Sequence, residues 1–312
     1  MFRFILKRLA AGVIMLFVIT SVAFFLLYLG GGDIARRILG QSASQEAVAA
    51  KAAQLGLNEP VLTQYTRWLQ GAVTGDFGDS WFTGQPVTEG ISSRLWVTLS
   101  IVFGATVVIA IVSVLLGVWA AVRGGGVDKV VQVITVLGFA IPGFIIALAL
   151  VLVFAINLGW VDPTGYVNFT KSPSGWLQSV SLPIIALAIG GIAGVTAQVR
   201  SSVVDALRQD YVRTLRSRGL GFNRVVYKHV LRNAGGPALA VLSVLFVGLL
   251  SGAVIVEQVF AIPGLGQVAV ISTTQADIPM VLGLVVVMAA IVVIVNLSID
   301  LLQGWLNPKV RV

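Results

Sequence analysis

The sequence predicts an all-α polytopic membrane protein, on the evidence of its composition and its long apolar runs. Hydrophobic residues make up 57% of the 312 residues and charged residues only 11%, whereas a soluble domain carries about 25% charged residues. Several apolar runs reach about twenty residues, the length that a helix needs to cross a ~30 Å hydrocarbon core. Backbone polar groups in lipid must be satisfied within the segment, so we expect these runs to be helices.

The same composition excludes several classes of site. The chain has no cysteine, which excludes disulfides and thiol chemistry, and it has one histidine, His229, which excludes a His-rich metal site. We predict no metal site in this chain. Because neither a catalytic constellation nor a nucleotide-binding loop is visible, we also predict no catalytic residue and no cofactor site.

The first apolar run is predicted to be a retained transmembrane helix within residues 1–29. It extends from Leu9 to Leu29 and follows Arg3, Lys7 and Arg8. A cleaved signal peptide is the alternative, but its apolar region is typically only ~7–15 residues long and precedes a small-residue cleavage site.

Residues 30–94 form one long polar insertion, predicted to lie outside the cytoplasm. Ser42 with Gln45 resembles a capping box for a helix that ends near Gly56. A second helix is predicted to start at Pro60, with one apolar face made by Val61, Tyr65, Trp68 and Leu69. The insertion has too few large apolar residues for a core of its own, so we expect a small cap packed on the membrane domain.

Five further spans are predicted in residues 95–312, which completes a set of six. They are Leu95–Val122, Val130–Leu158, Leu182–Val199, Pro237–Val256 and Val281–Leu302. Only six of the 21 basic residues fall in the segments predicted to face outward: Arg36, Arg37, Lys51, Arg67, Arg94 and Lys171. The positive-inside bias then places both termini and the central loop in the cytoplasm. Because the basic residues follow topology, the net charge of +8 does not indicate nucleic-acid binding.

The central basic loop, about residues 200–236, lies between the fourth and fifth predicted spans. Val203, Leu207, Tyr211 and Leu215 recur every four residues, which predicts an amphipathic helix that continues out of the fourth span. Gly219 is predicted to end that helix.

A second short helix is predicted after the glycine elbow. Asn223 is its expected cap, and the helix should cover Arg224–Asn233 and end at Gly235-Gly236-Pro237. A helix–glycine–helix elbow between two spans can act as a rigid lever. The alternative is a basic loop that only sets topology and touches lipid headgroups.

This loop resembles the coupling loop of the permease subunits of ABC importers, most closely in the dipeptide/oligopeptide branch. The residues that carry the resemblance are Tyr211-Val212-Arg213-Thr214, Arg216-Ser217-Arg218-Gly219-Leu220 and His229-Val230-Leu231-Arg232-Asn233. Further stretches agree in order along the chain: Leu55–Pro60, Gly75–Gly78 and Glu257–Gly266. The match departs at Leu215, where the family usually has Ala, and at Arg218, where Lys is common.

The resemblance implies a type I ABC importer permease fold and a subunit that catalyses nothing itself. It implies a homologous second permease, two cytoplasmic ATPase subunits that bind ATP and magnesium, an external solute-binding protein, and di- or oligopeptides as the solute. Coupling to the ATPase would use the 205–233 loop, with these residues: Tyr211, Arg213, Thr214, Leu215, Arg216, Arg218, Gly219, Leu220, Phe222, His229 and Arg232.

Small and polar residues inside the spans are the remaining candidates. Small residues at helix-packing spacing are Gly190, Gly194, Gly248 and Gly252, for packing within the bundle or against the second permease. Polar residues that could line a pathway are Ser243, Ser251, Gln258 and Asn296, together with Asn157 and Gln198. Helix-to-helix hydrogen bonds are an equal alternative for each.

Three rival functions stay open at this level. The same architecture could import a nickel complex, glutathione or haem. A secondary transporter is disfavoured because ionisable residues are nearly absent from the middle of the spans. A membrane-embedded enzyme is disfavoured because no catalytic constellation is visible, and the glycine runs at Gly30 and Gly124 lack the Gly-Lys-Ser/Thr ending of a nucleotide-binding loop.

Overall fold

The computed structural model describes residues 2–30 and 34–306, and the regular structure within them is helical. Five helical segments there are long and apolar enough to cross a membrane. They are α1 (Phe2–Gly30), α5 (Val87–Arg123), α8 (Pro173–Leu207), the continuous segment that ends in α11 (Leu231–Val259), and α13 (Ile278–Leu306). A bent pair of shorter helices brings the number to as many as six. The predicted all-helical membrane fold is therefore confirmed.

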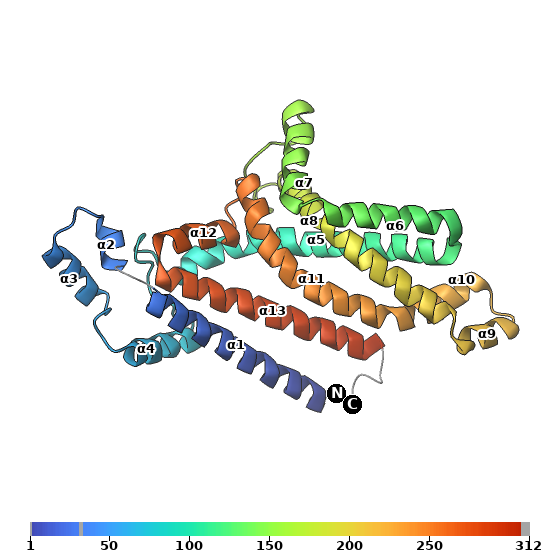
Figure 1. The fold of residues 1–312 in the computed structure, drawn as a ribbon, viewed down its shortest axis with the longest axis horizontal. Helices are drawn as coiled ribbons and strands as arrows, with labels where there is room; N and C mark the ends of the chain where they lie inside the picture. The colour runs from blue at the N-terminus through green and yellow to red at the C-terminus, as the bar shows by residue number, and fades with distance from the viewer. Residues whose placement is uncertain (1, 31–33, 307–312) are drawn as a thin grey trace. The chain divides into compact units, whose positions relative to one another are not determined.

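The remaining elements are shorter and fall between these spans in the order of the chain; Figure 1 labels the α-helices. They are α2 (Ile34–Leu39), α3 (Gln45–Gln54), α4 (Val61–Thr74), α6 (Gly125–Ala140), α7 (Gly143–Leu150), the π-helical η1 (Val151–Asn157), α9 (Asp210–Ser217), α10 (Phe222–Val225), the π-helical η2 (Val226–Val230) and α12 (Leu265–Gln275).

Contacts divide the described residues into two compact units. The first unit holds residues 2–8, 97–262 and 294–306, and the second holds residues 9–96 and 263–293. The long helices α1, α5 and α13 contribute residues to both units.

Helix α8 is the centre of the first unit, because it packs against α6, α7 and α11. Gly191 lets α8 approach α5 and α11 closely. A Cβ atom there would lie 2.5 Å from Ile109 Cδ1 and 2.9 Å from Leu245 Cδ2. Carbon atoms prefer to be about 3.5–4.0 Å apart, so any side chain at this position would overlap its neighbours.

A buried carboxylate joins two helices of the first unit. Glu257, near the end of α11, has no exposed surface and accepts a hydrogen bond of 2.5 Å from Thr98 Oγ1 on α5. Buried charged groups require such partners because desolvation is costly. This contact joins residues 159 positions apart, and no local pattern in the sequence indicates it.

The third predicted span is broken, which corrects the expectation of one helix over Val130–Leu158. Helices α6 and α7 are bent by 93° at Ile141-Pro142, and Figure 1 shows α7 leaving the line of α6. Ile141 is extended, with φ −94° and ψ 118°. Proline disfavours the helical conformation in the residue before it and has no N–H to donate. The apolar run continues across this break, so hydropathy alone reads it as one span.

The other spans extend beyond the predicted ends. Helix α8 begins at Pro173 rather than at Leu182, and the hydroxyl of Ser172 accepts a capping hydrogen bond of 3.1 Å from Gly175 N. Pro183 lies inside this helix. Hydropathy identifies the part of a helix that lies in hydrocarbon, whereas the polar turns that extend it are set by capping.

In the second unit an aromatic cluster holds the insertion against α1 and α13. The rings of Phe24 and Tyr28 stack at 4.2 Å, and the ring of Tyr65 on α4 lies 5.2 Å from that of Phe24. Ile278 and Leu282 of α13 complete the buried centre. The predicted apolar face of the second insertion helix packs here through Val61, Tyr65 and Trp68. The insertion therefore packs on spanning helices and has no separate core.

A carboxylate also fixes the loop between α4 and α5. Asp277 is only 2% exposed, and it accepts hydrogen bonds from Ser80 Oγ at 2.5 Å and from Trp81 N at 3.1 Å. Ser80 Oγ in turn accepts from Thr83 N at 3.1 Å. This network ties the end of the insertion to the start of α13.

Two details of the second unit differ from the prediction. Ser44, not Ser42, caps α3, and its hydroxyl accepts from Ala47 N at 3.2 Å. Helix α12 occupies a segment that was expected to be a connection between the last two spans. The second insertion helix begins directly after Pro60, as predicted.

Candidate functional site

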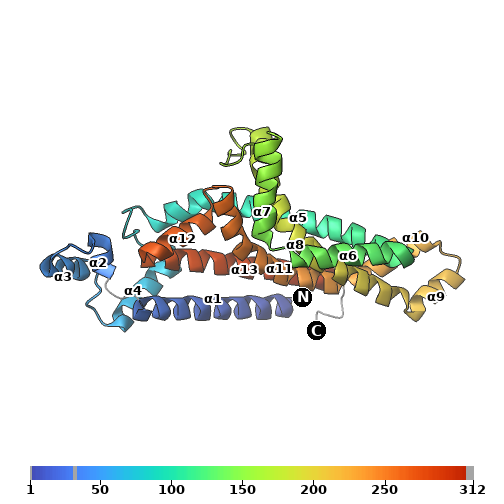
Figure 2. The same cartoon turned by 45° about the horizontal axis from the view of Figure 1, so that its top comes forward.

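The chain between α8 and α11 forms a helix–elbow–helix loop at one end of these two helices. Figure 2 shows α9 and α10 at the ends of α8 and α11. The predicted continuous helix through Val203–Leu215 is wrong, because α8 ends at Leu207 and α9 starts at Asp210. Gln209 between them is extended, with φ −70° and ψ 147°. This extended conformation is the usual one for an N-cap residue, and Gln209 occupies the N-cap position of α9.

Gly219 forms the elbow, as the sequence predicts. Its φ is +83°, in the left-handed region that favours glycine. Its N–H donates to Arg216 O at 2.9 Å, and Leu220 N donates to Leu215 O at 3.3 Å. These bonds satisfy the last carbonyls of α9, which is how a glycine-terminated helix normally ends.

The second loop helix is longer than predicted and does not end at the expected breakers. It begins at Phe222, one residue before the predicted cap Asn223, with Gly221 in the cap position and no side-chain capping bond. It then continues through η2 into α11, and Pro237 lies inside α11. The expected stop at Gly235-Gly236-Pro237 is therefore wrong. Helices of membrane proteins tolerate such residues because local π adjustments and neighbouring helices compensate.

The loop turns its apolar side inward and its charges outward. Val212, Val225, Val226 and Val230 are buried. Of the predicted coupling residues, these are half-buried: Tyr211, Leu215, Leu220, Phe222 and His229. These are exposed: Arg213, Thr214, Arg216, Arg218, Gly219 and Arg232. The exposed set forms a basic surface that another protein can contact.

Arg216 also braces the elbow from within. Its guanidinium lies 5.5 Å from the centroid of the Phe222 ring, so it links α9 to α10. Such a contact contributes ~0.5–1 kcal/mol at an exposed site. Arg213 pairs with Asp210 at 3.6 Å, but their side chains are 82% and 95% exposed, so this pair contributes little.

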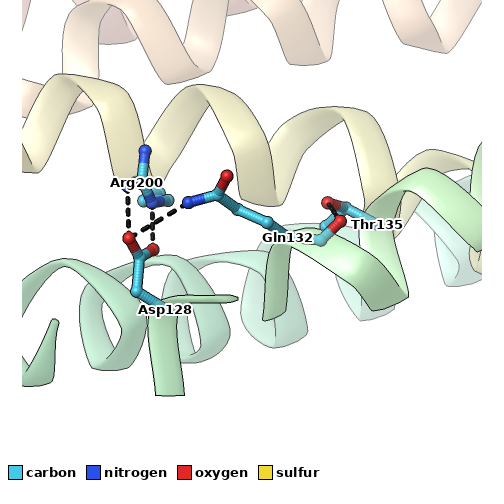
Figure 3. A network of polar contacts seen from close by, with 4 residues as sticks. All are labelled: Asp128, Gln132, Thr135 and Arg200. Atoms are coloured by element: carbon cyan, nitrogen blue, oxygen red, sulfur yellow. Dashed lines mark hydrogen bonds and ion pairs between the residues drawn. The ribbon is translucent and has the colours of Figure 1, made fainter. Parts of the chain in front are cut away.

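A polar cluster fastens α6 to α8 within the first unit (Figure 3). Nε and Nη2 of Arg200 both donate to the carboxylate of Asp128. Gln132 Nε2 donates to the same carboxylate at 3.0 Å, and Thr135 Oγ1 donates to the carbonyl of Gln132 at 2.7 Å. No pattern in the sequence indicates this pair, because its members are 72 positions apart.

The predicted pathway residues fall into two groups: residues that hydrogen-bond to each other within the protein, and residues that are exposed. Ser243 Oγ donates to Asn296 Oδ1 at 2.7 Å, so these two residues join α11 to α13. Ser251 and Gln258 are exposed on α11.

The four glycines predicted to pack helices also fall into two groups, according to whether they contact other residues of this chain. A Cβ on Gly194 would lie 3.2 Å from Phe139, and one on Gly252 would lie 3.1 Å from Leu187, so these two permit packing within the unit. A Cβ on Gly190 or Gly248 would meet open space.

The fold and this loop define a membrane-spanning component of a transport system. Residues 113–312 match the family described as "Binding-protein-dependent transport system inner membrane component", and residues 1–102 match the family of its N-terminal segment. The first match covers more than half of the chain, so this chain belongs to that family.

Individual relatives are similar over their full length. A putative peptide transport system permease protein of Brucella abortus is 36% identical over 308 residues, covering 98% of each chain. The oligopeptide transport system permease protein AppB of Bacillus subtilis is 35% identical over 316 residues, covering 100% of each. The glutathione transport system permease protein GsiC of Salmonella paratyphi A is 34% identical over 316 residues, covering 100% of this chain and 99% of that one.

A solved structure supports the fold. The MetNI methionine ABC transporter, in inward-facing conformations, matches with a TM-score of 0.56 over 70% of this chain and 96% of that chain. The sequences are 16% identical, so this likeness concerns the fold alone.

Family membership confirms the central prediction of a permease subunit of an ABC importer. The named relatives are transport components, so the chain is a transport subunit rather than an enzyme. Such importers operate with an ATPase and a substrate-binding protein, which are therefore partners of this chain.

Proposed function

We propose that this chain is the first of two homologous permeases of an ABC importer for di- and oligopeptides. It lies in the bacterial inner membrane with both termini in the cytoplasm, in accord with the distribution of its basic residues. The assignment of peptides as the cargo is supported by full-length similarity to permeases named for peptides, oligopeptides and glutathione. Glutathione is itself a tripeptide.

The loop of residues 205–233 transmits force from the ATPase. Its buried valines fix it to the helix ends, and its arginines project outward. ATP and magnesium bind the ATPase subunits, not this chain. Each charge-assisted hydrogen bond across such a contact contributes about 1.5–3 kcal/mol, so a few arginines suffice to couple two proteins. Closing and opening of the ATPases move the elbow at Gly219, and the attached helices switch the side of the membrane to which the passage is open.

The second permease packs against helix faces that this chain leaves open. Gly190 on α8 and Gly248 on α11 have no atoms in the space that a Cβ would fill. Small residues let a neighbouring helix approach closely. The passage then lies between the two permeases, and the exposed Ser251 and Gln258 face it.

Transport by the whole complex tests this function. The chain is co-purified with its partners, reconstituted in proteoliposomes with the binding protein outside, and assayed for uptake of labelled trialanine. We expect uptake that needs ATP in the lumen and that unlabelled peptides compete away, whereas nickel complexes and haem do not. Uptake that ignores ATP and stops when the ion gradient is dissipated would establish a secondary transporter instead.

A further inference from the structure

A wide, open cavity of about 450 Å³, with polar and apolar surface in nearly equal parts, lies where the end of α8 and the start of α11 meet the start of α9. Its volume lies in the range of pockets that hold small molecules, about 300–1,000 Å³. All of its walls belong to the first unit. The lining residues are Gln198, Ser202, Asp205, Ala206, Gln209, Tyr211, Asn233, Ala234 and Pro237.

One face of α8 supplies three of the polar lining groups: an amide, a hydroxyl and a carboxylate. Gln198, Ser202 and Asp205 are spaced so that they share that face, and Gln209 adds a second amide after the helix has ended at Leu207. Gln198 Nε2 donates to Ser202 Oγ at 3.0 Å. A second cavity of about 320 Å³ beside α6 shows the contrast, since nearly all of its surface is apolar. Acyl chains suit that second cavity, whereas the first requires a polar occupant.

Asp205 is the only charged residue among the lining residues of this cavity. In the part of the chain that the structure describes it has no ion pair, although the loop around it is rich in arginine. Arg200 pairs with Asp128, and Arg213 pairs with Asp210. The carboxylate of Asp205 is therefore available to a cation from outside the chain.

Tyr211 supplies a second unsatisfied group in the lining. Its hydroxyl oxygen is buried and has no hydrogen-bond partner within residues 2–30 and 34–306. A buried hydroxyl without a partner costs roughly 1–3 kcal/mol. The oxygen itself has almost no accessible surface, so a molecule in the cavity reaches it only when the Tyr211 side chain moves.

The cavity continues into an exposed strip on α11. Pro237 lines the cavity and begins this strip, which then follows one helix face through Ala240, Val244, Gly248, Ser251, Ile255 and Gln258. The exposed face of α5 differs, because it carries only large apolar residues at Phe103, Val107, Ile111 and Leu115. Lipid suits the α5 face. The α11 strip combines small and polar residues with the larger Val244 and Ile255, and it runs from Pro237 at the cavity to Gln258 near the far end of the helix.

We infer that this cavity is a release-side binding site for the ammonium end of the transported peptide. Asp205 pairs with the ammonium group, and the amides of Gln198, Gln209 and Asn233 serve the peptide's N–H and C=O groups. The inference rests on the proposed peptide import and on the cytoplasmic position of the loop. A carboxylate among neutral donors and acceptors favours a primary ammonium over an anion, which sets the direction of the bound peptide.

Thiol protection tests the site directly, because the chain has no cysteine of its own. Ser202→Cys is introduced into the full complex, with cysteine-free partners, in lipid nanodiscs without nucleotide. The rate of its modification by a charged thiol reagent is measured with trialanine and with N-acetyl-trialanine. We expect trialanine to slow the modification and the acetylated peptide to need about tenfold more for the same effect, as loss of one charge-assisted bond implies.

Asp205→Asn in the same background is expected to weaken protection by trialanine about tenfold. Asp210→Asn is the matched control, since it removes the same charge five positions away and lies outside the lining. It should leave protection unchanged. If Ser202→Cys fails to assemble, Gln209→Cys reports on the same cavity.

Equal protection by both peptides, or protection that survives Asp205→Asn, overturns the inference. So does a thiol that no reagent reaches in any nucleotide state, because the partners would then cover the cavity. ATP-driven uptake of trialanine by the wild-type complex separates the two hypotheses. Uptake without protection refutes only the release site, and no uptake refutes the proposed cargo.

Discussion

Gly219 offers the sharpest test of the lever. Its φ of +83° is left-handed, and a Cβ built on it would meet nothing within 4 Å. A side chain there would therefore encounter no steric clash, and its whole effect would be conformational. A non-glycine residue in the left-handed region costs about 1–2 kcal/mol. Gly219→Ala should therefore reduce the population of the native elbow by about 5- to 30-fold relative to alternative loop conformations.

The consequence for coupling follows from that population. If the ATPase binds only the native elbow, the apparent affinity of the permease for the ATPase falls by the same factor. Asparagine tolerates the left-handed region better than alanine, so Gly219→Asn should retain more coupling. Gly219→Pro should be the most severe variant, because proline fixes φ near −65° and removes the N–H that donates to Arg216 O at 2.9 Å.

The assay compares ATP hydrolysis with peptide uptake in proteoliposomes that contain the complete complex. The expected order of uptake per ATP hydrolysed is wild type, Gly219→Asn, Gly219→Ala and Gly219→Pro. Gly221→Ala is the matched control, since Gly221 also has open space around a Cβ but an ordinary φ of −61°. If Gly219→Ala and Gly219→Pro behave like Gly221→Ala, the left-handed elbow has no part in coupling and the reasoning fails.

Three other substitutions follow from the described contacts. Arg216→Glu should lower uptake per ATP more than Arg218→Glu, because only Arg216 also braces the elbow through the Phe222 ring; equal losses would assign the effect to docking charge alone. Asp128→Asn should destabilise the subunit by about 1–2 kcal/mol, since it leaves the half-buried guanidinium of its α8 partner with a neutral acceptor, and an unchanged thermal midpoint would contradict this. Gly191→Ala should destabilise by ~1–3 kcal/mol through overpacking, whereas Gly190→Ala, with open space around the new methyl group, should be neutral or stabilising in the same thermal measurement.

Local patterns in the sequence predicted the class of the protein and the position of its loop. A helix in lipid needs a fixed length of apolar residues, so the spans are visible without any knowledge of their neighbours. Gly219 is visible for a similar reason, because a helix end that needs a left-handed residue favours glycine wherever it occurs.

Local breakers were harder to interpret. Ile141-Pro142 bends the third span by 93°, yet its apolar surroundings resemble those of a continuous helix. Gly235-Gly236-Pro237 reads as a stop, yet the helix passes through it. A proline restricts its own φ angle and removes one backbone N–H donor. Whether the chain bends or continues depends on the packing around it.

The polar pairs show what the tertiary structure alone decided. The sequence displays Ser243 and Asn296 as two candidates for a pathway, but they satisfy each other across two helices. The partners of Arg200, Glu257 and Asp277 lie 72, 159 and 197 positions away in the chain. A polar group in a helical bundle pairs with whichever partner the packing of the helices brings near it. The spacing of two residues in the sequence does not indicate how far apart they lie in the fold. Which polar residues are satisfied inside the protein, and which remain for a solute or a partner, is therefore decided by the fold.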